Sequence, residues 1–283
     1  GLDPRAATNA AWTVGVPRFA ALFKRLEMPA TFYCVAADLE VEDNRDRLRA
    51  LAEEGFEIGN HSWRHNYRLT RLPASEQRAE LTEGRARLEA ASGVSVVGFR
   101  APGYHSSGGL QSHLRESGHR YESSAFPCVP YYLAKASVMG WLRLRGRASG
   151  SLLGSPKILL APRAPYRAAV DDPYRRGEGL PHYPVSVCCG VPLIGTTFTA
   201  LGTRLSRQLA KLSAQFNNHL TVEFHAADLL SIEDDQLDPA LSKQPDLRVS
   251  VTKKEARFTA LLTKLKESHR FERLDQLAGR ALL

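Results

Sequence analysis

Three repeats of a helix followed by a strand constrain the fold of this chain more than any other feature. Residues with helical spacing precede short, apolar, β-rich runs at 30–36, 56–60 and 96–99. Only short connections join each helix to its strand, so each new strand must be carried back by a crossover and runs parallel to the previous one. The pattern predicts an α/β fold built on a parallel sheet.

The same pattern resumes near the end of the sequence. It predicts a helix over 205–216, a strand over 220–224 and a last helix over 253–267. Between the two parts, residues 126–200 are rich in proline, which interrupts helices and central strands. We therefore predict a single domain over 1–283, with a basic, Pro-rich insertion at about 126–200.

Composition places the chain among ordinary globular proteins. Of its 283 residues, 43% are hydrophobic and 24% are charged, which excludes disordered, collagen-like and coiled-coil proteins. No run of 18 apolar residues and no signal-peptide core occurs. The four cysteines form neither a disulfide framework nor a Cys-x-x-Cys metal motif, which favours a reducing compartment such as a bacterial interior.

Two histidines four residues apart, His61 and His65, directly follow the strand that ends at Asn60. If the turn opens a helix, both imidazoles lie on one face and can converge on one cation, for which Zn²⁺ is well suited. Taken alone, this spacing is more often a pair of solvated histidines. Its position at the carboxyl end of a parallel strand, where α/β folds place their sites, favours a metal site.

Two further strand ends carry a reactive side chain. Arg100 follows one predicted strand and can orient a carboxylate by a two-pronged hydrogen bond, while Tyr104 lines a substrate groove. His225 follows another. Each has an ordinary alternative, because Arg100 fits a surface loop and a histidine such as His225 is more often a core or rim residue. Three independent strand ends together favour a functional site.

Five motifs occur in order along the chain, over most of residues 14–125 and 205–275. They are Ala30-Thr-Phe-Tyr, His61-Ser-Trp-Arg-His65, Arg100-Ala-Pro-Gly-Tyr104, Tyr121-Glu-Ser-Ser124 and Glu223-Phe-His225-Ala-Ala-Asp228-Leu-Leu. In this order they resemble the motifs of the polysaccharide deacetylases, the family 4 carbohydrate esterases. The resemblance implies a distorted (β/α) barrel and metal-dependent hydrolysis of an acetamide on an amino sugar.

The resemblance also implies roles for individual residues. His61 and His65 would hold a divalent metal, with zinc the expected ion, which polarises the acetyl carbonyl and the attacking water. Arg100 would orient the general-base aspartate, and His225 would protonate the leaving amine as the general acid. A final set would bind the substrate, namely Tyr104, Pro102 and Trp63.

One motif of the family has no clear counterpart. An Asp-Asp or Asp-x-Asp pair at the end of the first strand supplies the base and a third metal ligand, but no strand pattern precedes Asp3 in this sequence. We expect the barrel to lack its first strand in the sequence given. One alternative is a catalytically inactive relative that binds a glycan or glycolipid, and another is a barrel hydrolase of a different amide or ester.

Positive charge is concentrated in residues 131–176. This segment holds nine Lys and Arg against two acids, which accounts for +7 of the formal net charge of +8. Its basic residues alternate with aromatic and aliphatic ones, as in segments that contact an anionic membrane surface. A solvated basic loop packed on the barrel is the alternative. No helix-turn-helix, zinc knuckle or aromatic strand platform supports a nucleic-acid partner.

We therefore predict that the partner is a glycan or a lipid-linked amino sugar, as for the subgroup of these deacetylases that acts on polyprenyl-phosphate sugars. The expected location is the bacterial cytoplasm, peripheral to the inner face of the cytoplasmic membrane.

Overall fold

The computed structural model describes residues 9–146 and 152–280. The chain divides into two compact units, which we describe separately. Unit 1 comprises Gly1–Ala30 and Leu193–Glu272, and unit 2 comprises Thr31–Pro192 and Arg273–Leu283. The single domain inferred from the sequence stays a prediction.

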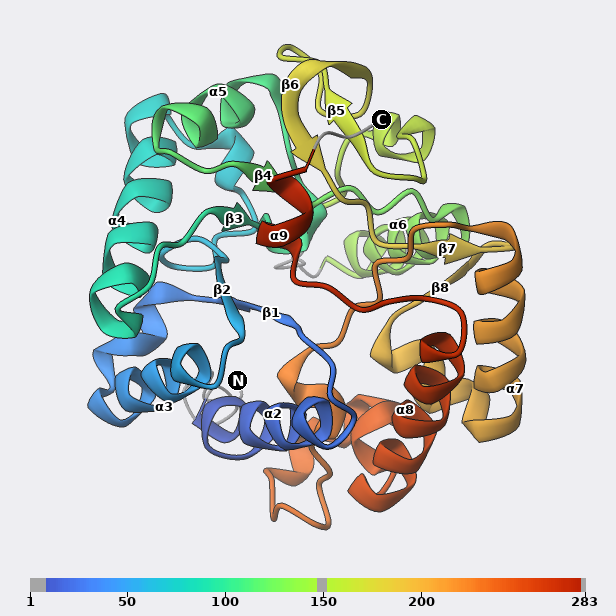
Figure 1. Cartoon of the computed structure of the whole chain (residues 1–283). Coiled ribbons are helices and arrows are strands. Elements are labelled where there is room, and N and C mark those ends of the chain that lie inside the picture. The colour runs from blue at the N-terminus through green and yellow to red at the C-terminus, as the bar shows by residue number, and fades with distance from the viewer. Residues whose placement is uncertain (1–8, 147–151, 281–283) are drawn as a thin grey trace. The chain divides into compact units, whose positions relative to one another are not determined.

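Unit 2 is built on a six-stranded sheet with the order β1-β2-β3-β4-β6-β5 (Figure 1). The first five strands of that order are parallel, and only β5 is antiparallel to its neighbour β6. The strands are β1 (Thr31–Cys34), β2 (Glu57–Asn60), β3 (Gly98–Phe99), β4 (Tyr121–Glu122), β5 (Tyr166–Ala168) and β6 (Arg176–His182). This arrangement confirms the predicted α/β class with a mostly parallel sheet, although the strands in the described ranges do not close into a barrel.

The helices between the first four strands carry the chain from each parallel strand to the next. They are α3 (Glu42–Glu53), α4 (Ala74–Ser92) and α5 (Gly108–Glu116), and α4 packs against both others. Gly55 and Gly93 follow α3 and α4 with φ of 87° and 75°. Both adopt the left-handed conformation that commonly ends a helix. Unit 2 also contains α6 (Val129–Leu144) and α9 (Leu274–Ala278).

Two glycines allow tyrosine rings to lie across the sheet of unit 2. A Cβ atom at Gly59 would collide with the ring of Tyr33, and one at Gly98 would collide with Tyr121. The tyrosine hydroxyls therefore meet, with Tyr33 donating to Tyr121 at 3.2 Å and Tyr121 donating to the Glu57 carboxylate at 2.6 Å. Burial raises the pKa of Glu57.

The C-terminal segment of unit 2 is fixed to the same carboxylate. The hydroxyl of Thr31 and the backbone N–H of Asp275 both donate to Glu57, and the backbone N–H of Leu274 donates to Thr31. These bonds attach the first turn of α9 to the amino ends of β1 and β2, because buried polar groups of this kind require partners.

Part of the segment predicted as an insertion lies in the sheet. β6 pairs with β4 through His182 and Glu122, so residues 176–182 extend the parallel sheet. A small hairpin follows, formed by β7 (Val187–Cys188) and β8 (Val191–Pro192). The sequence of β6 contains two glycines and a proline, so it lacks the β-rich pattern by which β1, β2 and β3 are predicted.

Unit 1 is helical, with an aromatic core. Its helices are α2 (Val16–Arg25), α7 (Gly195–Phe216) and α8 (Val251–Lys266). Phe224 contacts Phe19, Phe198 and Phe258 at ring-centroid distances of 5.2, 5.9 and 4.9 Å. The predicted strand over 220–224 is reduced, within the described residues, to one parallel bridge between Glu223 and Ile194. The helix predicted from 205 begins earlier, because α7 continues across a break at Gly202.

Short 3-10 and π turns complete both units. In unit 1 they are η1 (Ala11–Gly15), η6 (Ala226–Leu229), η7 (Pro239–Lys243) and η8 (Pro245–Arg248), and in unit 2 η2 (Ala36–Glu40), η3 (Leu69–Arg71), η4 (Pro102–Tyr104) and η5 (Pro156–Leu160). Over the ranges that the structure describes, no helix has the length and apolarity needed to cross a membrane.

Candidate active site

The carboxyl ends of β1, β2 and β3 meet in unit 2 and bring two of the sequence motifs together. The backbone N–H of His61 donates to the Cys34 carbonyl at 2.9 Å, and that of Arg100 donates to the Asn60 carbonyl at 3.0 Å. These ladder bonds place the loop that begins at His61 beside the loop that begins at Arg100. Because these strands are parallel, both loops begin at the same edge of the sheet, which is where α/β folds place their sites.

The two histidines converge, but a loop and not a helix brings them together. The rings of His61 and His65 lie edge to face, with centroids 4.8 Å apart. Ser62 and His65 both have left-handed backbone conformations, with φ of 67° and 55°, and the Ser62 hydroxyl accepts a hydrogen bond from the His65 N–H at 3.0 Å. The expected helical turn is therefore wrong. Non-glycine residues rarely adopt such angles, and they cluster at functional sites.

The contacts of His61 fix its tautomer. Its Nδ1 lies 2.7 Å from the carbonyl oxygen of Arg100, which can only accept, so Nδ1 carries the proton. In the neutral imidazole with this tautomer, Nε2 has the lone pair that binds a divalent metal, and a backbone carbonyl is a common partner for the other nitrogen of a metal-binding histidine.

The two histidines could supply two of the ligands of a metal ion. Within the described ranges, no third His, Cys, Asp or Glu joins His61 and His65 in a group that could hold an ion. Asp3, the residue discussed for the first motif, lies outside the described residues. The donor set that the structure describes is therefore two imidazoles, one of them in the metal-binding tautomer.

Arg100 points its guanidinium into the interior of unit 2. Its Nε donates to the Ser123 carbonyl and its Nη2 to the Ser123 hydroxyl, both at 2.8 Å. The guanidinium also lies 4.6 Å from the ring centre of Tyr33. Arg100 is buried, and these contacts fix its side chain between the ends of β1, β3 and β4.

Tyr104 and Pro102 lie in η4, directly after Arg100. Pro102 is buried, and Tyr104 follows Gly103 in a left-handed conformation with φ of 68°. The Tyr104 ring contacts Phe126 at 4.9 Å and Tyr131 of α6 at 6.2 Å between centroids. A small pocket lies beside these rings and is also lined by Tyr132, Lys135, Leu153, Gly154 and Ile158.

Trp63 packs against α4. The guanidinium groups of Arg64 and Arg87 lie 3.3 and 4.8 Å from its ring centre. Its backbone N–H donates to the Glu80 carbonyl at 3.0 Å. These contacts account for the position of the tryptophan without a substrate, so its predicted role in substrate binding stays a prediction.

A second polar cluster of unit 2, which the sequence did not predict, lies at the ends of β4 and β6 and includes His182 and Glu122. The Nε2 of His182 accepts hydrogen bonds from the backbone N–H groups of Ser124 and Ala125 at 3.1 and 2.9 Å. Burial lowers the pKa of His182 to about 3, which keeps the imidazole neutral. His182 lies in β6, the strand that the sequence pattern missed.

Glu122 belongs to the same cluster. Its carboxylate accepts hydrogen bonds from the Ser106 hydroxyl at 3.0 Å and from the Gln111 amide. It is fully buried, and burial raises its pKa to about 7. Glu122 belongs to the motif Tyr121-Glu-Ser-Ser124, but nothing in the neighbouring sequence indicates that its side chain points into the interior.

His225 lies in unit 1, at the start of η6, and its side chain is exposed. Its backbone N–H donates to the Asp228 carboxylate at 2.7 Å, while its Nδ1 lies 4.0 Å from Asp228 and its Nε2 lies 4.0 Å from Glu223. Burial raises the pKa of Asp228. Asp228 therefore fixes the backbone of His225. The other predicted site residues all belong to unit 2.

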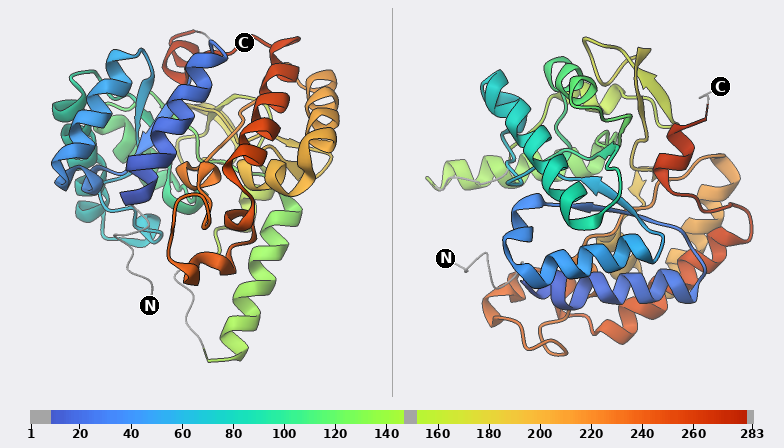
Figure 2. Two further views of the ribbon diagram at one scale, coloured as in Figure 1. Left: turned by 90° about the horizontal axis from the view of Figure 1, so that it is seen from below. Right: turned by 60° about the vertical axis from the view of Figure 1, so that its left-hand side comes forward.

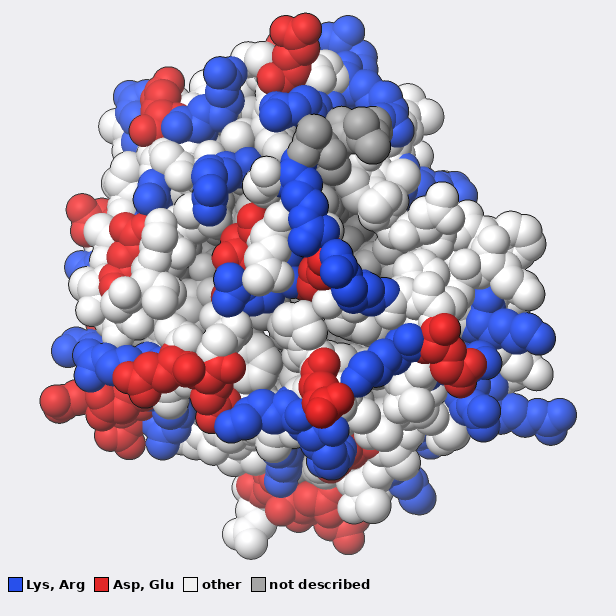
Figure 3. Space-filling model, in the orientation of Figure 1, with Lys and Arg blue, Asp and Glu red and all other residues white. Residues whose placement is uncertain are grey.

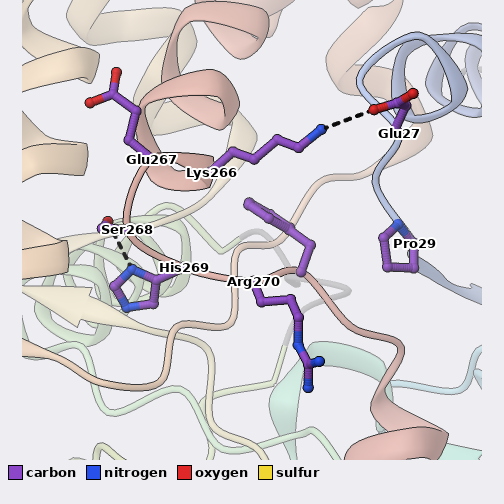
Figure 4. Close-up of a pocket in the computed structure, with 8 residues that line it drawn as sticks. Glu27, Pro29, Lys266, Glu267, Ser268, His269 and Arg270 are labelled. Carbon is purple, nitrogen blue, oxygen red and sulfur yellow. Dashed lines mark hydrogen bonds and ion pairs between the residues drawn. The ribbon is translucent and has the colours of Figure 1, made fainter.

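A separate open pocket of unit 1 is shown in Figure 4. It is crossed by the ion pair of Lys266 with Glu27 at 3.6 Å, and Ser268 hydrogen-bonds to His269 at 3.1 Å on its wall. None of the residues predicted to act in the site lines this pocket.

Comparison with known proteins supports the sequence resemblance. The sequence profile of the polysaccharide deacetylase family matches residues 9–121. A peptidoglycan deacetylase from Helicobacter pylori is 25% identical over 122 residues, which are 42% of this chain and 41% of that protein. The chain therefore spans less than half the length of this curated relative.

Solved structures share the fold of the chain. A protein assigned as a polysaccharide deacetylase from Mycobacterium smegmatis has a TM-score of 0.60 at 18% identity, with 96% of this chain and 78% of that chain covered. The Puue allantoinase has a TM-score of 0.59 at 17% identity, with 96% and 73% covered. Both confirm the predicted fold class.

Proposed function

The chain is a relative of the polysaccharide deacetylases, and from this premise we propose that it is a metal-dependent hydrolase that removes an N-acetyl or related acyl group from an amino sugar. The observation that carries the proposal is the meeting of His61 and Arg100 at adjacent strand ends, where the Arg100 carbonyl holds His61 in the metal-binding tautomer. The family as a whole supports hydrolysis of an amide in a glycan.

The proposed roles follow the chemistry of each group. His61 and His65 would hold a divalent metal, for which zinc suits an imidazole site, and the bound metal would supply Lewis-acid polarisation of the acyl carbonyl and of water. Arg100 would orient the carboxylate that acts as general base. Its guanidinium is buried and hydrogen-bonded to Ser123, so its position is defined before substrate arrives.

His225 is the proposed general acid, which would protonate the leaving amine of the sugar. It suits the role because its side chain is exposed while Asp228 fixes its backbone. The sugar would bind along Tyr104, Pro102 and Trp63. Of these, Tyr104 lines a pocket with further aromatic rings, which can pack on the apolar face of a sugar.

Metal content tests the ligand assignment directly. We expect a His61→Ala/His65→Ala double variant, purified beside the native chain, to lose most of the bound metal measured by elemental analysis. His219→Ala is a matched control, since His219 is exposed and lies in unit 1. Equal metal content in the native chain and the double variant would refute the ligand assignment.

Acetate release tests the reaction. The native chain should release acetate from N-acetylated amino-sugar oligomers, and the double histidine variant should be at least about a hundredfold slower. Binding of the oligomer without release of acetate would instead identify a catalytically inactive glycan-binding relative. Hydrolysis of a different amide or ester, with no release from the oligomers, would identify the third alternative.

We also propose that the amino sugar is linked to a lipid and that the chain acts at the inner face of a bacterial cytoplasmic membrane. The support is the net charge of +7 in residues 131–176, because anionic lipids attract a basic segment. Acetate release from a polyprenyl-phosphate amino sugar should be faster than from the matching free sugar. Equal rates would refute the lipid-linked substrate.

A further inference from the structure

Helix α6 exposes a stripe of apolar side chains. None of its 16 residues is buried, although the helix contains several large apolar residues. Leu133, Val138, Trp141 and Leu144 have relative exposures of 57%, 58%, 49% and 90%. Their spacing places them along one side of a helix, so they form a continuous surface, which we call the α6 stripe.

The first turn of α6 attaches the helix to unit 2. Tyr131 contacts Phe126 at 4.8 Å between ring centroids, and the Tyr132 hydroxyl donates to the Gly154 carbonyl at 3.0 Å. Beyond these contacts, which lie in the first turn, the helix projects away from the sheet of unit 2 (Figure 2). The same first turn reaches Tyr104, so α6 extends from the candidate active site.

The charge of α6 has one sign. Between 129 and 146 the sequence contains Lys135, Arg143 and Arg145 and no acid. Arg145 lies over the Trp141 ring at 4.2 Å, and within the described ranges neither Arg143 nor Arg145 pairs with a carboxylate. The acids of the basic segment lie elsewhere, with Asp172 paired to Lys157 and Asp171 paired to Arg175.

We infer that α6 docks on an anionic lipid bilayer, with the α6 stripe inserted at the boundary between headgroups and acyl chains and Arg143 and Arg145 at the lipid phosphates. Apolar and aromatic residues on one side of a helix, with basic residues beside them, are the features by which helices bind such surfaces. A second copy of the chain suits the stripe less well. Two α6 helices packed together would bring only positive charges into contact.

This inference deepens the proposed membrane contact and rests on it, but it is tested by binding and not by catalysis. Vesicle flotation would compare phosphatidylcholine vesicles with vesicles that also contain phosphatidylglycerol. The native chain should float with the anionic vesicles. A Trp141→Ser/Leu144→Ser double variant, which loses two large apolar side chains, should partition at least about thirtyfold less.

An Arg143→Gln/Arg145→Gln double variant tests the electrostatic contribution. It should bind anionic vesicles about thirtyfold less than the native chain and should respond less to phosphatidylglycerol content. Phe216→Ser is the matched control, because Phe216 is 73% exposed but lies on α7, and it should bind as the native chain does. Circular dichroism of each variant would verify that it is folded.

Three results would overturn the inference. They are no binding of the native chain to anionic vesicles, binding that both α6 double variants retain, or a concentration-dependent dimer that the Trp141→Ser/Leu144→Ser variant loses. The His61→Ala/His65→Ala variant should float as the native chain does. Loss of hydrolysis and loss of membrane binding are therefore separable results.

Discussion

The strand ends of unit 2 and helix α6 both reverse the usual distribution of side chains, in opposite directions. At the ends of β2, β3, β4 and β6 many of the buried residues are polar, whereas α6 exposes large apolar residues and buries none. Either arrangement is more informative than an apolar core or a polar surface. The buried polar set consists of Asn60, Ser62, Arg100, Glu122, Ser123, Ser124 and His182.

Burying polar groups and exposing apolar side chains both cost free energy, and the two regions differ in what offsets that cost. Most polar groups of the strand ends bond to one another, as Arg100 does with Ser123 and Glu122 with Ser106. Within the described residues, three buried atoms of this set have no hydrogen-bond partner, namely Asn60 Oδ1, Glu122 Oε1 and His182 Nδ1. The α6 stripe stays exposed to solvent in unit 2. This comparison assigns the strand ends to chemistry within the chain and α6 to contact with another surface.

Helix α3 shows how an ordinary surface helix of this unit looks. Its acidic and basic side chains form pairs, with Arg47 beside Asp43 at 3.7 Å and Arg49 beside Asp46 at 3.8 Å. In Figure 3, basic and acidic side chains lie side by side at the lower left, where Figure 1 places α3. It also buries Leu48 against the rest of unit 2. Because α6 has, within the described ranges, neither an ion pair nor a buried face, exposure alone does not account for its composition.

The same substitution in both regions should give the largest contrast. Arg100→Met removes two charged hydrogen bonds and leaves the Ser123 carbonyl without its donor, so we expect a loss of about 3 kcal/mol in the free energy of unfolding. Arg145→Met, at the end of α6, removes only an exposed contact with Trp141. It should change the free energy of unfolding by less than about 0.5 kcal/mol. Urea denaturation measures both. Similar losses would mean that the two regions are equally packed.

The buried carboxyl of Glu122 should make stability depend on pH. Its pKa is raised by burial from 4.5 to about 7, so the stability it contributes is full below pH 4.5 and is lost as the pH rises through 7. The expected loss is about 3 kcal/mol, since one pKa unit corresponds to about 1.4 kcal/mol.

Glu122→Gln isolates this effect, because every other group titrates in both proteins. Urea denaturation at pH 5 and pH 8 should show that the native chain loses about 2.5 kcal/mol more than the variant over this interval, because a small part of the loss has already occurred at pH 5. An identical pH dependence in the two proteins would contradict the assignment of a shifted carboxyl to the strand-end cluster.

Local sequence patterns predicted the first part of unit 2, from β1 to β3. The alternation of helix and strand through β3, and the helix ends at Gly55 and Gly93, follow from periodicity and from the conformational freedom of glycine, whereas the short strand β4 was not predicted. β6 could not be predicted in this way, because its residues join the sheet only through pairing with β4. Likewise, the apolar run at 220–224 predicted a strand, but a single bridge forms there.

The sequence indicated where part of the candidate site lies but not its geometry. The positions of His61 and Arg100 after parallel strands indicated that they lie at one edge of the sheet, and their loops do meet there. The convergence of His61 and His65 depends on two left-handed residues, which no spacing rule reveals. His182 escaped prediction together with its strand, because its partners Ser124 and Ala125 lie far away in sequence.

The hydrogen bond that attaches the first turn of α6 to unit 2 allows a test with a smaller expected effect. Tyr132→Phe removes the hydrogen bond to the Gly154 carbonyl, which we expect to weaken the attachment of α6 by about 1 kcal/mol while the strand ends are unaffected. Amide hydrogen exchange in α6 should then accelerate about fivefold, with no change in β2 or β3. Faster exchange in those strands as well would show that α6 and the sheet open as one unit.

The smallest effect is expected at the end of α6. Leu144 is 90% exposed, so Leu144→Ser removes almost no buried surface and should change the free energy of unfolding by less than about 0.5 kcal/mol, measured by urea denaturation in the absence of lipid. A loss above about 1 kcal/mol would mean that Leu144 packs within the folded chain. The stripe would then belong to the core of unit 2, and the contrast between α6 and the strand ends would no longer hold.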